Sequence, residues 1–225
     1  MENNFIYLDN ASTTPLSENV LNIINSTYRN YWHNPSSTYE LGIKCSTYLE
    51  KIRSKIAYIF EADPEDIIFT SGSSESTNIV FNNIYENFKN GRVVISNVEH
   101  QATTICANKL RKQNWDIYEW TVNNDGILNI SNIEKFLNND TKLVSIIWGQ
   151  SEIGTIQPVQ FIGSKCEELN IMFHLDGTQI LSNGIFSWKD LKCDFLSLSA
   201  HKFGGPKGIG ILLTKEKSRQ ILKNK

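Results

Sequence analysis

The sequence LSLSAHKFGGPKGIG, residues 196–210, joins a short apolar run to a glycine-rich turn. Leucine alternates with serine before the turn, and residues 209–213 are apolar again, so we expect a strand on each side. Lys202 falls between the first strand and the glycines, where its amine would enter a crevice instead of bulk solvent. A lysine desolvated in this way can act as a nucleophile. The opposing interpretation, a lysine solvated in a turn, fits Lys207 better.

Outward from this stretch, short apolar and β-branched runs alternate with longer helical patterns. This alternation is typical of a parallel sheet that is covered by helices on both faces. Strands are predicted at residues 67–70, 92–96, 115–120, 143–148, 171–175, 194–198 and 209–213. The predicted fold class is therefore α/β, a three-layer sandwich around a mostly parallel, seven-stranded sheet. Such sheets bind ligands at the carboxyl ends of their strands, which is where functional residues are expected.

Helices are predicted where apolar residues recur at spacings of three and four. Between the strands they fall at residues 75–88, 102–112, 131–137 and 161–169. Two more precede the sheet, at residues 17–31 and 39–60, and Ser17 is the expected N-cap of the first. They form an N-terminal helical arm over about residues 1–62. Without a linker in the sequence, we expect residues 1–225 to form a single large domain.

Composition excludes several classes of function. Of the 225 residues, 40% are hydrophobic and 20% are charged, and the formal net charge is -2. The chain has no basic field for a nucleic-acid backbone and no apolar run near the roughly 18 residues that cross a bilayer, so neither is an expected partner. The N-terminus has no signal or transit pattern, which predicts a cytoplasmic protein. The cysteines are too scattered to predict a disulfide or metal site and are expected to pack inside the fold; they are Cys45, Cys106, Cys166 and Cys193.

Three other predicted strand ends carry polar residues. Ser73 and Ser74 follow residues 67–70 in a turn that suits a phosphate, although a serine-capped helix needs the same residue types. His100 precedes a helix and could stack on a planar ligand, move a proton or simply lie on the surface. Asp176 ends an apolar strand, where a carboxylate needs a cation or strong hydrogen bonds; an N-cap is the alternative.

Together with Lys202, these residues form a set that suits pyridoxal phosphate. This cofactor needs an anion site, a group that stacks on its ring, an acid opposite its pyridine nitrogen and an amine that bonds to its aldehyde. Each signal alone has an ordinary structural explanation. Their joint order along the chain favours the cofactor.

Several motifs resemble those of the cysteine desulfurases in the class V aminotransferase group. They are YLDNASTTP at 7–15, NPSS at 34–37, FTSG at 69–72, EH at 99–100, EIGTIQP at 152–158, HLD at 174–176 and SAHK at 199–202. The resemblance runs in one order from residue 6 to residue 213. It implies fold type I of the pyridoxal phosphate enzymes, whose large domain has a seven-stranded sheet, in agreement with the strands expected from the sequence.

The resemblance also implies roles for the candidate residues. Lys202 holds the cofactor and moves protons, Asp176 pairs with the protonated pyridine nitrogen, and His100 stacks on the ring and assists proton transfer. The residues implied to contact the phosphate are Ser73, Ser74, Ser199 and His201. The residues implied to contact the ring hydroxyl are Gln179 and Ser151, and Ser151 is shorter than the asparagine usual in the family. The implied reaction removes sulfur from L-cysteine and leaves alanine and a persulfide on a cysteine of the enzyme.

Other parts of the family's machinery fall beyond residue 225. These are the small C-terminal domain, the sulfur-carrying cysteine, the arginine that binds the substrate carboxylate and a phosphate-binding threonine from the neighbouring subunit. We therefore expect a fragment, or a chain completed by a separate C-terminal partner, with a homodimer and a sulfur-acceptor protein as further expected partners. Tyr39 also stands where the family usually has a histidine.

Two alternatives stay open at this stage. One is another class V enzyme of the same cofactor, a selenocysteine lyase or an aminotransferase, because substrate choice lies largely outside these residues. The other is a non-catalytic interaction protein of the same fold, which the absent cysteine loop and Ser151 would suit.

Overall fold

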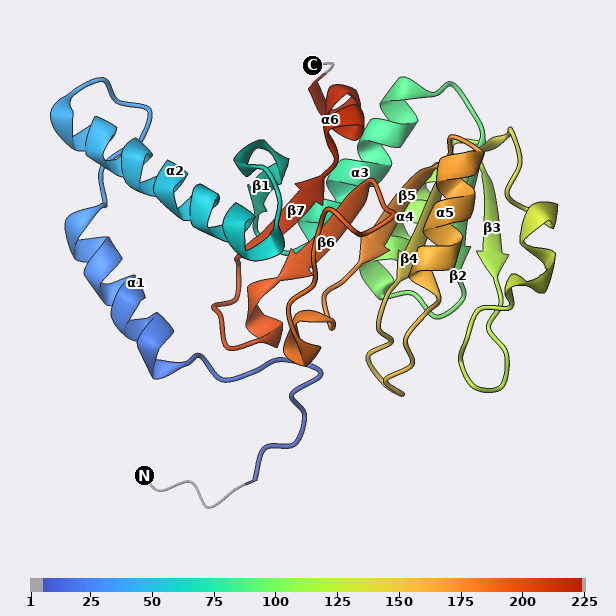
Figure 1. Ribbon diagram of the computed structural model, residues 1–225, viewed down its shortest axis with the longest axis horizontal. Helices are drawn as coiled ribbons and strands as arrows, with labels where there is room; N and C mark the ends of the chain where they lie inside the picture. The colour runs from blue at the N-terminus through green and yellow to red at the C-terminus, as the bar shows by residue number, and fades with distance from the viewer. Residues whose placement is uncertain (1–5, 224–225) are drawn as a thin grey trace.

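A computed structural model describes residues 6–223 and contains a seven-stranded sheet (Figure 1). The strands are β1 (Ile67–Thr70), β2 (Arg92–Ser96), β3 (Asp116–Trp120), β4 (Thr141–Ile147), β5 (Met172–Asp176), β6 (Phe195–Ser199) and β7 (Gly210–Thr214). Their order is β1-β7-β6-β5-β4-β2-β3, and β7 runs antiparallel to both of its neighbours while the other pairs are parallel. The predicted α/β class with a mostly parallel, seven-stranded sheet is confirmed.

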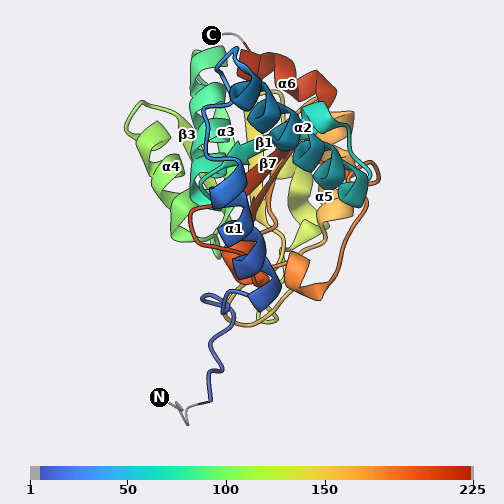
Figure 2. The ribbon, with the colours of Figure 1, turned by 90° about the vertical axis from the view of Figure 1, so that its left-hand side faces the viewer.

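Helices cover both faces of the sheet, which lies between them in Figure 2. One face is covered by α3 (Ser73–Asn87) and α4 (Gln101–Arg111), whose Phe81 and Leu110 belong to a buried cluster with sheet residues. The other is covered by α5 (Val159–Glu168) and the end of α2 (Glu40–Phe60), which contribute to a second cluster. Burial of these two apolar clusters is the main force that holds the three layers together.

Strand β5 shows how alternation sorts side chains between the two faces. Phe173 and Leu175 pack in the cluster beside α5, whereas Asp176 accepts a hydrogen bond from Ser73 of α3. His174 shares the Asp176 face and is fully buried, and its two ring nitrogens each lie 2.8 Å from a serine hydroxyl of a neighbouring strand. Burial lowers the pKa of His174 to about 4, so the imidazole is neutral at physiological pH.

Residues 131–137, expected to be helical, instead contribute to the 3-10 helix η2 (Ile130–Lys135). In a 3-10 helix, residues three apart lie on one face. Ile130, Ile133 and Phe136 have this spacing, and all three contact the buried cluster beside α5. The apolar pattern therefore reports burial correctly, but three-residue spacing suits the tighter helix as well as an α-helix.

The predicted helical arm comprises α1 (Glu18–Asn30) and α2, with residues 1–5 outside the described chain. Ser17 caps α1 as predicted, because its hydroxyl accepts a hydrogen bond from the Val20 amide at 3.3 Å. No residue of α1 is buried, and the helix extends away from the sheet in Figure 1. Of the two helices of the arm, α2 packs on the core, and its last turn includes the buried Ala57 and Phe60.

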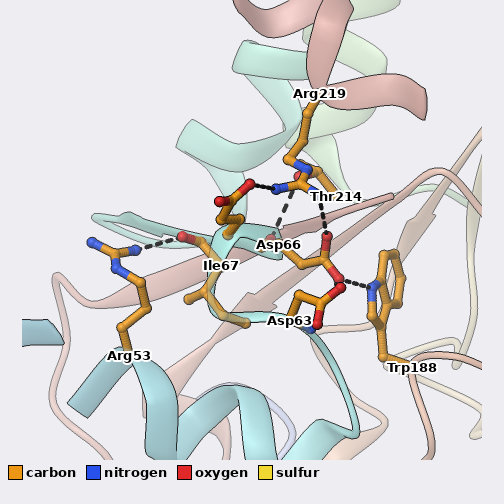
Figure 3. A network of polar contacts seen from close by, with 8 residues as sticks. Arg53, Asp63, Asp66, Ile67, Trp188, Thr214 and Arg219 are labelled. Atoms are coloured by element: carbon orange, nitrogen blue, oxygen red, sulfur yellow. Dashed lines mark hydrogen bonds and ion pairs between the residues drawn. The ribbon is translucent and has the colours of Figure 1, made fainter. Parts of the chain in front are cut away.

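The helix α6 (Glu216–Lys223), which the sequence patterns did not predict, follows β7 and contacts α3. Its Arg219 lies 2.6 Å from a Glu65 oxygen and 3.5 Å from Asp66 Oδ1 (Figure 3). Asp66 Oδ2 accepts from the Trp188 indole at 3.2 Å. Burial raises the pKa of Asp66, and the positive charge of Arg219 opposes that rise. This network ties α6 to the turn before β1.

The four cysteines are all free and buried, as expected from their scattered positions. Across residues 6–223, no group of side chains has the composition of a metal site. In the same range, no helix combines the length and apolar character needed to cross a membrane.

Candidate functional site

A cavity of about 200 Å³ lies where β4, β5 and β6 end, beside the first turn of α3. Every site residue proposed from the sequence lines it: Ser73, Ser74, His100, Ser151, Asp176, Gln179, Ser199, His201 and Lys202. Four larger cavities among residues 6–223, of about 390, 370, 350 and 280 Å³, contain none of these residues. The structure therefore brings together residues that are spread over more than half of the sequence.

Lys202 ends the short 3-10 helix η4 (Ala200–Lys202) that follows β6. Its Nζ donates to the Ala11 carbonyl at 2.5 Å and to the Ser12 carbonyl at 3.0 Å. Partial burial lowers the pKa of Lys202, although nearby negative charges, that of Asp176 first among them, oppose the shift. A lowered pKa makes the neutral, nucleophilic amine easier to reach.

Asp176 is the buried carboxylate of the cavity, with only 3% of its surface exposed. Its Oδ1 accepts hydrogen bonds from the Ser73 hydroxyl at 3.3 Å and from the Thr178 amide and hydroxyl at 3.0 and 2.5 Å. The bond to the Thr178 amide forms a local turn, but no helix begins there, since the next helical segment starts at Leu181. The N-cap interpretation of Asp176 is therefore wrong.

The first turn of α3 faces the cavity through Ser73 and Ser74. The N-cap is Gly72, which has no side chain. Ser73 and Ser74 therefore do not cap α3, contrary to the structural alternative considered from the sequence. Gly72 has a φ of +151°, and a Cβ there would lie 3.3 Å from Ser199 Oγ. This glycine lets the helix start approach β6, where Ser199 Oγ accepts from the Ser73 amide at 2.7 Å.

His100 is exposed, and it also lines the cavity. A position on the surface is therefore compatible with contact to a ligand. It is the N-cap of α4, and its Nδ1 accepts from the Ala102 amide at 3.1 Å. Because an amide can only donate, Nδ1 carries no hydrogen in this arrangement. In the neutral ring the proton is therefore on Nε2, the nitrogen left to face a ligand.

The N-terminal segment 11–14 lies across one side of the cavity. The Ala11 carbonyl accepts from Gln179 Nε2 at 2.8 Å as well as from Lys202. Thr13 Oγ1 lies 3.1 Å from His201 Nδ1, and partial burial together with the neighbouring lysine charges lowers the pKa of His201. This segment fixes three of the predicted site residues.

Ser151 lies on the loop after β4 and lines the cavity. A hydrogen bond from its hydroxyl is the main cause of a lowered pKa at Glu152. The carboxylate of Glu152 also bonds the Gln150 side chain, so the loop is braced by its own polar groups.

Sequence reasoning missed two polar residues that line the cavity, Ser12 and Thr178. Ser12 belongs to the motif at 7–15, which was used for the family resemblance but given no role. Thr178 stands between the candidates Asp176 and Gln179, and this position was the available sequence signal, whereas its two hydrogen bonds to the carboxylate are visible only in the structure.

The mostly parallel, seven-stranded sheet and its solved structural neighbours show that the fold is fold type I, which is named for a class of pyridoxal phosphate enzymes. The chain belongs to the class V aminotransferase family, since the profile described as "Aminotransferase class-V" matches residues 6–224.

Curated relatives and solved structures show which members of the family the chain is similar to. Over 217 residues the chain is 35% identical to "Cysteine desulfurase, mitochondrial" of Candida maltosa, and the match covers 95% of this chain and 45% of that protein. A solved structure named "NIFS-LIKE PROTEIN" superposes with a TM-score of 0.90 at 32% identity, covering 94% of this chain and 59% of the other. "SspA in complex with cysteine" gives 0.88 at 30% identity, covering 93% and 61%. The chain spans about half the length of the curated relatives it matches.

Proposed function

We propose that this chain is the cofactor-binding part of a pyridoxal-phosphate-dependent cysteine desulfurase. In the proposed reaction the C–S bond of L-cysteine breaks, a thiol of the protein takes up the sulfur as a persulfide, and alanine is the other product. The names of the relatives support this choice, and one of the similar solved structures is described as a complex with cysteine.

One observation carries the proposal: the buried carboxylate of Asp176 shares a cavity with the amine of Lys202 and keeps one oxygen unused. All of its hydrogen bonds within residues 6–223 end on Oδ1, and no ion pair in that range includes it. A buried anion of this kind is costly without a cation. The protonated nitrogen of a pyridine ring is a cation of the right shape for Oδ2.

The other donors fit the same cofactor. Ser73, Ser74 and Ser199 place hydroxyls beside the positive end of α3, where a phosphate is favoured. His201 adds a ring nitrogen, and Gln179 and Ser151 offer polar atoms for a ring hydroxyl. When bound, pyridoxal phosphate supplies an electron sink for the bonds at the substrate α-carbon.

Within this proposal, each protein residue has a task of its own. Lys202 Nζ holds the cofactor and carries a proton to and from the substrate α-carbon. His100 Nε2, the nitrogen not committed to the start of α4, can exchange a proton with the substrate. Asp176 keeps the ring nitrogen protonated through its charge.

The thiol that takes up the sulfur has no candidate among the cysteines of the chain. All four are buried and unpaired, and burial raises the pKa of Cys106, Cys166 and Cys193, which disfavours the reactive thiolate. The proposal therefore includes a thiol from a further segment or a partner chain, a homodimer or a complementing C-terminal chain, and an acceptor protein. From the sequence patterns we also propose a cytoplasmic location. Residues 1–225 are proposed to form a single large domain together with the helical arm.

The proposal is tested by titrating the protein with pyridoxal phosphate and following visible absorbance. We expect a yellow complex that survives gel filtration but is lost in Lys202→Ala. Lys207→Ala is the matched control, because Lys207 is exposed in the same glycine-rich turn and should leave the complex intact. A wild-type protein that stays colourless would refute the cofactor assignment.

Substrate choice is tested on the same complex. L-cysteine is expected to change the spectrum, and alanine and persulfide are expected once a thiol-bearing C-terminal chain is added. Spectral changes with other amino acids but not with cysteine would instead favour another class V activity. No change with any amino acid would favour a non-catalytic interaction protein.

A further inference from the structure

Glu99 lies directly before His100 in the turn between β2 and α4, and its carboxyl group joins two strands. Oε1 accepts from the Ser96 hydroxyl at 2.5 Å and from the Ile147 amide at 2.7 Å. Ser96 ends β2 and Ile147 ends β4, so this single oxygen ties the turn to the neighbouring strand. Ile147 is also the partner of Asp176 in the register of β4 and β5.

The second oxygen of Glu99 is in a different situation. Oε2 is buried and has no hydrogen-bond partner within residues 6–223. A charged carboxylate oxygen without any donor is expensive to bury, and protonation lowers that cost because it removes the charge. Burial raises the pKa of Glu99 to about 8, with the nearby charge of Asp176 acting in the same direction.

We propose that Glu99 is a positioning residue that holds the His100 turn against the end of β4 as an uncharged carboxylic acid. This inference rests on the proposed function, since it is the use of His100 at the cavity that gives the turn its importance. Glu99 does not line the cavity, so it acts through His100 and through the end of β4.

The uncharged state matters because Asp176 is close by. If Glu99 were ionised, its charge would add to that of Asp176, and two neighbouring carboxylates resist joint ionisation. The groups beside Glu99 have charged neighbours of their own: Lys202 interacts with Asp176, and Glu152 interacts with His100. His174, the remaining titratable group on the same face of β5, is itself neutral. A neutral Glu99 leaves the charge of Asp176 available for the ligand.

The test compares Glu99→Gln with Glu99→Ala in the protein without cofactor. Glutamine keeps the shape of the protonated acid, including an oxygen for Ser96 and Ile147, while alanine removes the tie. Asp66→Asn is the matched control, because it also converts a buried acid of raised pKa to an amide, in the turn before the edge strand β1.

The first readout is the nuclear magnetic resonance signal of the His100 imidazole. We expect it to be unchanged in Glu99→Gln and in Asp66→Asn and to shift in Glu99→Ala. A signal that moves equally in the glutamine and alanine variants would overturn the proposal, because the neutral shape would then not suffice.

The second readout is stability against pH. The raised pKa means that the contribution of Glu99 is fully present below about 4.5 and is lost as pH rises through about 8. The stability of Glu99→Gln relative to wild type should therefore increase with pH across this window and become constant above it. If the stability difference between Glu99→Gln and wild type stays constant from pH 5 to 8, Glu99 is already ionised, which contradicts the proposal. This readout does not need the alanine variant, so it decides the question even if that variant does not fold.

The third readout is the dissociation constant of pyridoxal phosphate at pH 7. We expect Glu99→Gln to stay within about 2-fold of wild type and Glu99→Ala to bind roughly 10-fold more weakly, the equivalent of one lost hydrogen bond. Equal weakening in both variants would contradict the proposal. If the wild type binds no cofactor, the proposed function fails, while the first two readouts still decide the state of Glu99.

Discussion

Two buried aspartates outside the cavity have a cation or a donor on each carboxylate oxygen, whereas the one inside it has its hydrogen bonds on one oxygen only. Asp66, 6% exposed, has Arg219 on one oxygen and the Trp188 indole on the other (Figure 3). Asp194, 4% exposed, has Lys217 at 3.1 Å on Oδ1 and the Phe173 amide at 2.8 Å on Oδ2. Asp176 is as buried as either, yet its hydrogen bonds end on one oxygen.

Under the proposed function, this difference separates carboxylates that support the fold from one that binds the cofactor. A buried charge with a cation and donors on both oxygens is neutralised by the fold itself and has little left to offer. Asp176 has donors that hold its orientation but no cation within residues 6–223 that pairs with it. Under the proposed function, the positive group that reaches Oδ2 is the protonated ring nitrogen of the cofactor.

The largest stability effect is expected at Arg219. In Arg219→Met, Asp66 loses its cation inside the fold, and the free energy of unfolding should fall by roughly 3 kcal/mol. Denaturant unfolding measures this loss. Asp176→Asn provides the contrast: an asparagine oxygen can still accept from Ser73 and Thr178, so stability should stay within about 1 kcal/mol of wild type. Equal losses in the two variants would remove the distinction between the two regions.

A smaller effect, spread over pH, is expected at His174 beneath Asp176. The folded pKa of about 4 lies below the ordinary 6.5, so the stability that His174 contributes is present above pH 6.5 and is lost as pH falls through 4. The slope is at most about 1.4 kcal/mol per pH unit. In His174→Gln the acid-dependent loss between pH 6.5 and 4 should be smaller, as measured by unfolding at several pH values. An unchanged slope would mean that His174 is already charged.

The smallest effect concerns the N-terminal segment. Thr14 Oγ1 accepts from the Gly204 amide at 2.7 Å and donates to the His201 carbonyl at 2.9 Å. Thr14→Val removes both bonds and should cost about 1 kcal/mol. We expect faster proteolysis before α1 with little change in the cooperative unfolding of the sheet. Proteolysis at the wild-type rate would show that other contacts hold the segment.

Periodicity predicted the sheet well because each buried strand has its own apolar run and a clear turn after it. The same reasoning placed polar residues at strand ends, and these ends meet because parallel strands share an edge. Lys202 and Asp176 were therefore predictable as candidates, and the structure places both at one cavity. Their proposed tasks rest on the resemblance.

Other features depend on contacts that no local pattern records. Glu99 was part of a quoted motif, but its bond to the Ile147 amide joins residues 48 positions apart. Arg219 lies on a short helix whose pairing with Asp66 spans most of the sequence. The unused oxygen of Asp176 is likewise a property of geometry, because sequence gives the carboxylate but not the number of its donors.

The central claim, that Asp176 keeps a place for a cationic ring, is tested most directly by the dissociation constant of pyridoxal phosphate. We expect Asp176→Asn to bind about 100-fold more weakly than wild type, since a buried charge pair loses one partner. Asp66→Asn should bind like wild type after correction for the folded fraction. Equal affinity in wild type and Asp176→Asn would contradict the account.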